Sequence, residues 1–149
     1  MTEERKKELS ENYARVLEMI EAAKKTRGGD KPVTLLAATK TVPAEDICYL
    51  IENCGLKLCG ENHAQEFTDK YDAVRAAGAE MDFIGHLQTN KVKYIVGKAR
   101  LIHSLDSIKL AEEINSRAEK LGVEQKVLVE VNIGEEKNKT GVNPGEVGE

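Results

Sequence analysis

The sequence predicts an α/β fold in which parallel strands alternate with helices. Short apolar runs, typical of strands buried within a sheet, alternate with longer segments whose apolar residues recur at helical spacing. The centres of the apolar runs recur at intervals of roughly 20 to 27 residues, as expected of β-α-β units. Such units build a parallel sheet with right-handed crossovers.

Size and composition are those of one globular domain. The chain has 149 residues, of which 40% are hydrophobic and 32% charged, enough to bury a core. The 22 basic and 26 acidic side chains leave a formal charge of -4, which gives no reason to expect nucleic acid or anionic membrane as a partner. No apolar stretch is long enough to span a bilayer, and the charged N-terminus does not resemble a secretory signal. We therefore expect a cytoplasmic protein.

The first elements follow from apolar spacing and from glycine. A long amphipathic helix ends near residues 27–30, and its apolar positions are Leu9, Tyr13, Val16, Leu17 and Ile20. The apolar run at 33–38 predicts a strand buried on both faces. A second helix begins at Pro43, and Gly55 suits the left-handed conformation that closes many helices.

The alternation continues along the rest of the chain. Strands are predicted at 56–59, 81–84, 100–103 and 126–133, and helices at 62–77, 88–96 and 106–121. We expect Asp106 to cap the last of these helices and Gly122 to end it. A closed (β/α) barrel has eight strands and typically needs about 200 residues or more. The sequence therefore predicts one domain over 1–149, a TIM-type barrel truncated after about five βα units, with a complete five-stranded open sheet as the alternative.

Polar side chains follow every predicted strand. In parallel α/β folds these positions converge on one face and carry function. They include Thr39, Lys40, Glu61, Asn62, His86, Gln88, His103, Ser104, Asp106 and Asn132. Lys40 emerges at the rim of an apolar strand, where desolvation favours the neutral amine that condenses with aldehydes. From position alone, a surface lysine at the start of a loop is the simpler interpretation.

The histidines and cysteines do not indicate a metal site. His86 and His103 each have two interpretations, as caps of backbone groups at a strand end or as ligand contacts, while His63 is expected to start a helix and face solvent. No two histidines show ligand spacing on one element. The odd cysteine set without paired spacing argues against disulfides and zinc, and we interpret these residues as small buried apolar groups: Cys48, Cys54 and Cys59.

Five sequence stretches carry a family resemblance. They are LLAATKTVPAEDI at 35–47, GENHAQE at 60–66, FIGHLQTNKVKYIV at 83–96, LIHSLDS at 101–107 and VLVEVNIGEEKNKTGV at 127–142. In this order they closely resemble the pyridoxal-phosphate homeostasis proteins, whose barrel is of the alanine-racemase type, the third fold class of such proteins. The resemblance covers nearly the whole chain from residue 33 onward.

The resemblance implies a cofactor and two site residues. Lys40 matches the lysine that holds pyridoxal 5'-phosphate as a Schiff base, and Asn62 matches a residue beside the cofactor pocket. His86 and His103 fall within the family motifs, although no chemical role is carried over to them. No catalytic residue and no metal ligand is implied.

The sequence also departs from the family pattern. Thr39 stands where the family usually has serine, and Met81 and Asp82 replace a usual Trp-His pair, which puts a ring-packing contact there in doubt. Family chains continue through three more strands, which carry the loop that grips the phosphate and an arginine at the pyridine nitrogen. Without them we expect weaker cofactor binding. Exposed strand edges would favour self-association of these 149 residues, whereas the family resemblance implies a monomer.

The resemblance further implies a non-catalytic carrier or regulator in cofactor and amino-acid homeostasis, with apo forms of pyridoxal-phosphate enzymes as partners. An arginine beside the pyridine nitrogen disfavours its protonation and makes the ring a poorer electron sink. The alternative is a racemase or lyase of the same fold acting on amino acids. Such an enzyme needs a second acid-base residue across the ring.

Overall fold

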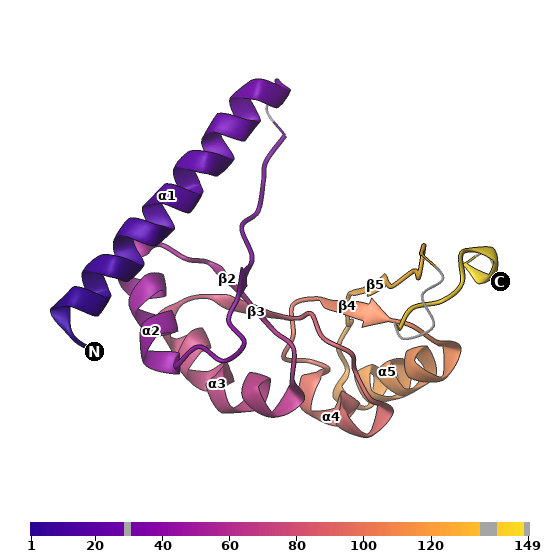
Figure 1. Cartoon of the computed structure of the whole chain (residues 1–149). Helices are drawn as coiled ribbons and strands as arrows, with labels where there is room; N and C mark the ends of the chain where they lie inside the picture. The colour runs from indigo at the N-terminus through magenta and orange to yellow at the C-terminus, as the bar shows by residue number, and fades with distance from the viewer. Residues whose placement is uncertain (29–30, 135–139, 148–149) are drawn as a thin grey trace.

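The structure, a computed structural model, describes residues 1–28, 31–134 and 140–147, and its centre is a parallel sheet (Figure 1). The strands are β1 (Ala37–Ala38), β2 (Leu58–Glu61), β3 (Glu80–Phe83), β4 (Ile102–Leu105) and β5 (Val127–Val129). They are hydrogen-bonded in the order β1-β2-β3-β4-β5, and every neighbouring pair is parallel. The predicted α/β class with a parallel sheet is confirmed.

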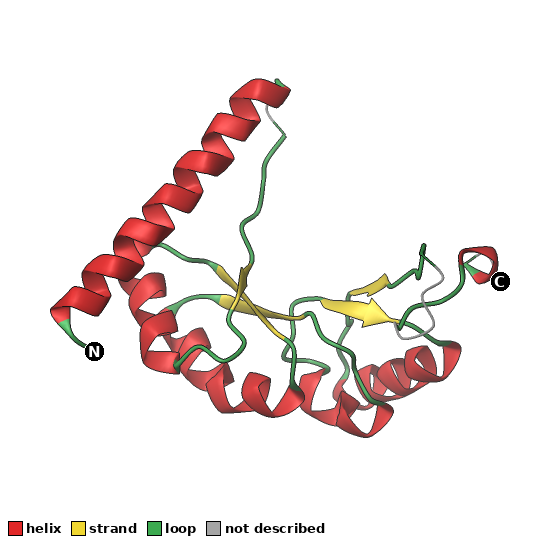
Figure 2. Cartoon of the chain, viewed as in Figure 1, coloured by secondary structure: helices red, strands yellow, loops and turns green. Residues whose placement is uncertain are grey.

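Helices connect the strands and cover one face of the sheet (Figure 2). The connecting helices are α2 (Ala44–Tyr49) with its π-helical continuation η1 (Leu50–Cys54), α3 (Ala64–Ala77), η2 (Thr89–Lys91), α4 (Val92–Ile95) and α5 (Ile108–Leu121). Helix α1 (Glu3–Arg27) precedes the sheet, and the short helix η3 (Pro144–Glu146) follows it. We call the face covered by α2 to α5 the outer face and the opposite one the inner face. In the described part of the chain, no helix is long and apolar enough to cross a membrane.

The core lies between the outer face and these helices. Its buried side chains come from β2 to β4 and from α2 to α5. At its centre Phe67 stacks on Tyr71, with ring centroids 5.6 Å apart, and meets the edge of Phe83 at 6.3 Å. The aromatic contacts therefore fasten α3 to β3.

Gly60 in β2 reveals which side chains share the inner face. A Cβ atom on Gly60 would lie 2.6 Å from Leu36 Cδ2 and 3.0 Å from Ile84 Cδ1, so these two side chains cover the glycine. Asp82 pairs with Gly60 in the β2–β3 ladder and therefore lies on the same face. Glu61, one residue later, points to the outer face.

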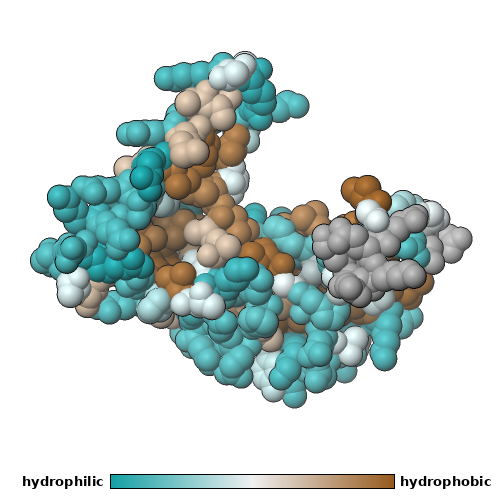
Figure 3. Space-filling model, in the orientation of Figure 1, coloured by the Kyte–Doolittle hydropathy of each residue, from teal (hydrophilic) through white to brown (hydrophobic). Residues whose placement is uncertain are grey.

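Helix α1 is attached to the rest of the chain along its N-terminal half. Arg5 Nε donates to Asp46 Oδ2 at 2.9 Å, the Ser10 and Tyr49 hydroxyls lie 2.9 Å apart, and Tyr13 packs against the core. The C-terminal half of the helix projects away from the sheet (Figure 1). Figure 3 shows hydrophobic residues gathered in the hollow between α1 and the sheet. The exposed apolar side chains of α1 are Val16, Leu17 and Met19.

Some predicted boundaries are wrong. The strand expected at 33–38 is limited to its last two residues and is not buried on both faces, because its first residue, Val33, is 47% exposed. β2 and β4 each begin two residues after the predicted positions. Asp106 does not cap α5; the cap is Ser107, whose hydroxyl accepts from the Leu110 N–H at 3.3 Å. Gly55 and Gly122 close their helices in the left-handed conformation, as expected.

Candidate functional site

Lys40 lies in a tight turn at the C-terminal end of β1. The Thr39 N–H donates to the Gly60 carbonyl at 2.9 Å and extends the β1–β2 ladder, and the Thr39 carbonyl accepts from the Val42 N–H at 3.1 Å. Lys40 and Thr41 are the central residues of this turn, and Thr41 has a φ of 62°. A positive φ is rare for a β-branched residue, and such a backbone costs about 1 to 3 kcal/mol. The surrounding structure must hold the turn in place.

A buried group of charged side chains lies against this turn on the outer face. Lys70 of α3 is 9% exposed, and its ammonium donates to Glu61 Oε1 at 2.8 Å, to Glu66 Oε2 at 3.0 Å and to the Thr39 carbonyl at 2.9 Å. Glu61 is fully buried, and one of its oxygens, Oε2, has no hydrogen-bond partner within the described residues. We call Lys70, Glu61 and Glu66 the Lys70 cluster.

The Lys70 cluster binds the chain on both sides of Lys40. On one side, the Thr39 hydroxyl donates to Glu61 Oε1 at 2.8 Å. On the other side, the Thr41 N–H donates to Glu66 Oε2 at 2.9 Å. A serine could supply the same hydroxyl bond, so Thr39 preserves the contact. Lys40 itself is exposed, and none of the described residues bonds its amine.

Electrostatics favour the charged forms of two members of the Lys70 cluster, Lys70 and Glu66. Burial alone would lower the pKa of Lys70, but its hydrogen bonds to Glu61 and Glu66 outweigh burial, and the pKa is raised. The pKa of Glu66 is lowered, first by the hydrogen bond from the Thr41 N–H and then by the bond from Lys70. The two shifts favour the charged forms that make these contacts.

Asn62 lines a cavity at the C-terminal ends of β2 and β3. The cavity has a volume of about 470 Å³ and is lined by Asn62, His63, Ala64, Gln65, Phe83, Gly85, His86, Leu87, Gln88 and Lys91. A Cβ on Gly85 would overlap the Asn62 carbonyl, so the close approach of the two loops requires glycine there. Lys40 lies at the same end of the sheet but is not among the lining residues. The structure thus brings Lys40 and Asn62 to one edge without joining them in one cavity.

Two histidines contact carboxylates. His86 Nδ1 lies 3.1 Å from Asp106 Oδ2, and His103 Nε2 lies 2.9 Å from Asp82 Oδ2. Asp82 is fully buried and also accepts from Arg100, from Nε at 2.9 Å and from Nη2 at 2.6 Å. We call Asp82, Arg100 and His103 the Asp82 cluster. Within the described ranges, no group of three or more His, Cys, Asp or Glu side chains could hold a metal ion.

The cysteines are free, and only one is fully buried. Burial raises the pKa of the Cys59 thiol to about 12, so the thiolate form is scarce at neutral pH. Cys48 and Cys54 are half-buried, which corrects the expectation that all three are buried. Their sulfur atoms lie 3.7 Å from the Ala73 carbonyl and 3.5 Å from the Ser10 hydroxyl, respectively.

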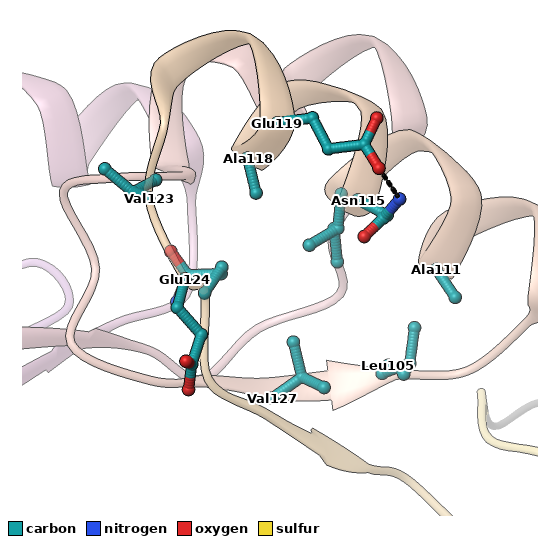
Figure 4. A pocket seen from close by; sticks show the side chains of 10 residues that line it. Leu105, Ala111, Asn115, Ala118, Glu119, Val123, Glu124 and Val127 are labelled. Atoms are coloured by element: carbon teal, nitrogen blue, oxygen red, sulfur yellow. Dashed lines mark hydrogen bonds between the residues drawn. The ribbon is translucent and has the colours of Figure 1, made fainter.

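A second cavity, of about 430 Å³, lies between α5 and β5 (Figure 4). Its walls include Leu105, Ala118 and Val127, and the Asn115 amide donates to Glu119 Oε1 at 2.9 Å beside it. Neither Lys40 nor Asn62 lines this cavity.

Sequence reasoning did not single out the Lys70 cluster. One signal was available, because Lys70 lies on the same face of α3 as the buried Phe67 and Val74. A lysine on a buried stripe requires a partner. Glu66, four residues earlier, is at the spacing of a helical ion pair.

Comparison with known proteins identifies relatives of this chain. No family model matches it. A protein of Aquifex aeolicus named pyridoxal phosphate homeostasis protein is 53% identical over 135 residues, which are 90% of this chain and 59% of the relative. A protein of the same name from Escherichia coli K12 is 34% identical over 147 residues, covering 95% of this chain and 62% of the relative. The chain thus spans about three fifths of the length of these relatives.

Solved structures with the same fold also match. A crystal structure of an unknown protein from Bifidobacterium adolescentis has a TM-score of 0.88 at 35% identity, over 97% of this chain and 63% of that one. PipY of Synechococcus elongatus with PLP bound has a TM-score of 0.66 at 28% identity, over 81% of this chain and 56% of that one. The resemblance found in the sequence motifs is confirmed: this chain is a homologue of the pyridoxal phosphate homeostasis proteins.

Proposed function

We propose that this chain binds pyridoxal 5'-phosphate through a Schiff base on Lys40 and acts as a non-catalytic carrier or regulator of the cofactor. The observation that carries the proposal is the position of Lys40. It is exposed, at the C-terminal end of a parallel strand, in a turn bonded on both sides to buried groups. The name of the relatives and the PLP-bound PipY structure support the choice of ligand.

We further propose that the sheet belongs to a (β/α) barrel, with residues 1–149 as one partial barrel domain. The sequential strand order, the parallel pairing and the single layer of helices support this arrangement. The inner face, with Leu36, Gly60 and Ile84, would then line the interior of the barrel.

The described residues fit the aldehyde end of the cofactor. Pyridoxal phosphate supplies an aldehyde, with which a neutral primary amine condenses and releases one water. None of the described residues bonds the amine of Lys40 or the half-buried amide of Asn62. Both groups can therefore contact a cofactor without giving up an existing hydrogen bond.

We favour a carrier over a racemase or lyase. Proton transfer to or from an amino acid requires an acid-base group that is free to exchange its proton. The carboxylates that contact the Lys40 turn, Glu61 and Glu66, are both committed to Lys70. A carrier also implies recipients, and we propose that these are apo forms of pyridoxal-phosphate enzymes.

The test is reductive trapping in the protein expressed from its complete reading frame. With pyridoxal phosphate and borohydride, we expect one stable adduct, which peptide mass spectrometry maps to Lys40. Lys40→Ala should abolish both the adduct and the visible absorbance of the Schiff base. Lys57→Ala, which removes another exposed lysine near the sheet, should leave both unchanged. Undiminished trapping in Lys40→Ala, or trapping spread over many lysines, would contradict the proposal.

A further inference from the structure

We infer that Glu66 and Lys70 are positioning residues for Lys40, because they hold the strained turn from which the Lys40 side chain emerges. The inference rests on the proposed role of Lys40 as the Schiff-base lysine. It concerns residues of α3 that do not themselves reach the cofactor in this scheme. They act through the backbone of the two residues that flank Lys40.

The first support is the strain at Thr41. Its φ of 62° lies in the left-handed region, which a β-branched side chain disfavours, so an unrestrained turn would relax toward negative φ. Such a relaxation would change the direction in which Lys40 leaves the strand. The Thr41 N–H donates to Glu66 Oε2 at 2.9 Å, which is the one hydrogen bond from the strained peptide to a side chain among the described residues. Glu66 therefore opposes the relaxation.

The second support is the geometry of Lys70. An ammonium has three donors, and those of Lys70 have three acceptors within 3.0 Å: the Thr39 carbonyl, Glu61 Oε1 and Glu66 Oε2. The Thr39 carbonyl is also the acceptor that closes the turn, since it receives the Val42 N–H. Lys70 thus joins the residue before Lys40 to the carboxylate that holds the residue after it.

The third support is the free-energy cost of burying these charged side chains. A lysine buried beside two carboxylates carries a desolvation cost, and structural stability alone could be served by apolar side chains at these positions. Here the charged groups bond to the backbone of the Lys40 turn and to the Thr39 hydroxyl, and to no other loop among the described residues. The arrangement resembles functional sites in which surrounding groups maintain local strain.

The experiment compares the rate of adduct formation at Lys40 in four forms of the protein from the complete reading frame, with pyridoxal phosphate as the probe. They are the wild type, Glu66→Gln, Glu66→Gln combined with Thr41→Gly, and the control Asp72→Asn, which changes an exposed carboxylate on the same helix. We expect Glu66→Gln to slow adduct formation by about tenfold, because misoriented reacting groups lose rate. Glycine adopts positive φ without strain, so the double variant should recover most of the rate.

A second measurement does not need the cofactor. In the apo protein, Glu66→Gln should accelerate hydrogen exchange of the Thr41 amide, while Asp72→Asn should not. If Glu66 has a purely structural role, Glu66→Gln should lower the stability of the protein without selectively accelerating exchange of the Thr41 amide. The added Thr41→Gly substitution should then not restore the rate of adduct formation.

The outcomes separate the two proposals. A wild type that forms no adduct at Lys40 contradicts the proposed function. The positioning role is overturned if the adduct at Lys40 forms equally fast in wild type and Glu66→Gln, or if the double variant is as slow as the single one. Neither result contradicts the proposal that Lys40 forms the Schiff base. Unchanged exchange at Thr41 also overturns the positioning role.

Discussion

Two buried carboxylates, one on each face of the same sheet, are neutralised in different ways. Glu61 of β2 lies on the outer face and is closed in by α3, whose Lys70 side chain is 11% exposed. Asp82 of β3 lies on the inner face, and its partners Arg100 and His103 have side chains that are 38% and 30% exposed. Each carboxylate has no exposed surface of its own.

This difference in solvent exposure indicates which of the two clusters can hold neighbouring backbone in a fixed conformation. The Lys70 side chain is only 11% exposed, so water can replace little of its pairing with the fully buried Glu61, and the bonds of the Lys70 cluster end on the Lys40 turn. The partly exposed side chains of Arg100 and His103 can rotate into solvent when Asp82 is lost. We therefore expect that damage to the Lys70 cluster costs more stability than damage to the Asp82 cluster.

The largest expected effect is that of removing the cation from each cluster. Lys70→Met leaves Glu61 buried without a counter-charge and should reduce the free energy of unfolding by about 3 to 5 kcal/mol. Arg100→Met also deprives a buried carboxylate of its guanidinium, but Asp82 keeps the contact with His103 Nε2 at 2.9 Å, so the cost should be smaller, about 1 to 3 kcal/mol. Urea unfolding followed by circular dichroism measures both. Equal losses in the two variants would refute the contrast between the faces.

A smaller effect is expected when each carboxylate becomes an amide. Glu61→Gln places an N–H₂ group where Glu61 Oε2 has no partner among the described residues, at a cost of about 1 to 3 kcal/mol. In Asp82→Asn the new amide faces donors, but Arg100 and His103 can turn toward water, so about 1 kcal/mol should be lost. Thermal unfolding of the two variants, side by side, measures the difference. A more severe loss in Asp82→Asn would show that the inner face is the less tolerant one.

The sequence was sufficient for the order of elements but not for every boundary. Alternating apolar runs and helix-closing glycines predicted the βα repeat, because these signals are local. Leu56 is fully buried, as a strand residue would be, yet it precedes β2 and donates from its N–H to the Leu50 carbonyl. Burial alone therefore could not locate the start of β2.

The sequence predicted the site residues that lie within the family motifs, but not the contacts that hold them in place. The strand-end rule included Lys40 and Asn62 among ten polar residues, and only the motif resemblance singled them out for the cofactor. The contact between Lys70 and Thr39 joins residues 31 positions apart, and no local pattern encodes such a contact. The positive φ of Thr41 was equally hidden, because the residue is not a glycine.

The smallest expected effect is the pH dependence of the stability that the Lys70 cluster contributes. It distinguishes this cluster from the histidine-containing Asp82 cluster. The pKa of Glu66 in the folded chain is below its ordinary value of 4.5, so the carboxylate stabilises the fold above pH 4.5 and loses that contribution as the pH falls through the lowered pKa. The advantage of wild type over Glu66→Gln in urea midpoint should therefore be constant near neutrality and shrink in acid. Because Lys70 has a raised pKa, its contribution is complete below pH 10.5 and should fade only in stronger base. An advantage that instead disappeared between pH 6 and pH 8 would mean that a histidine, and not this cluster, controls the turn that carries Lys40.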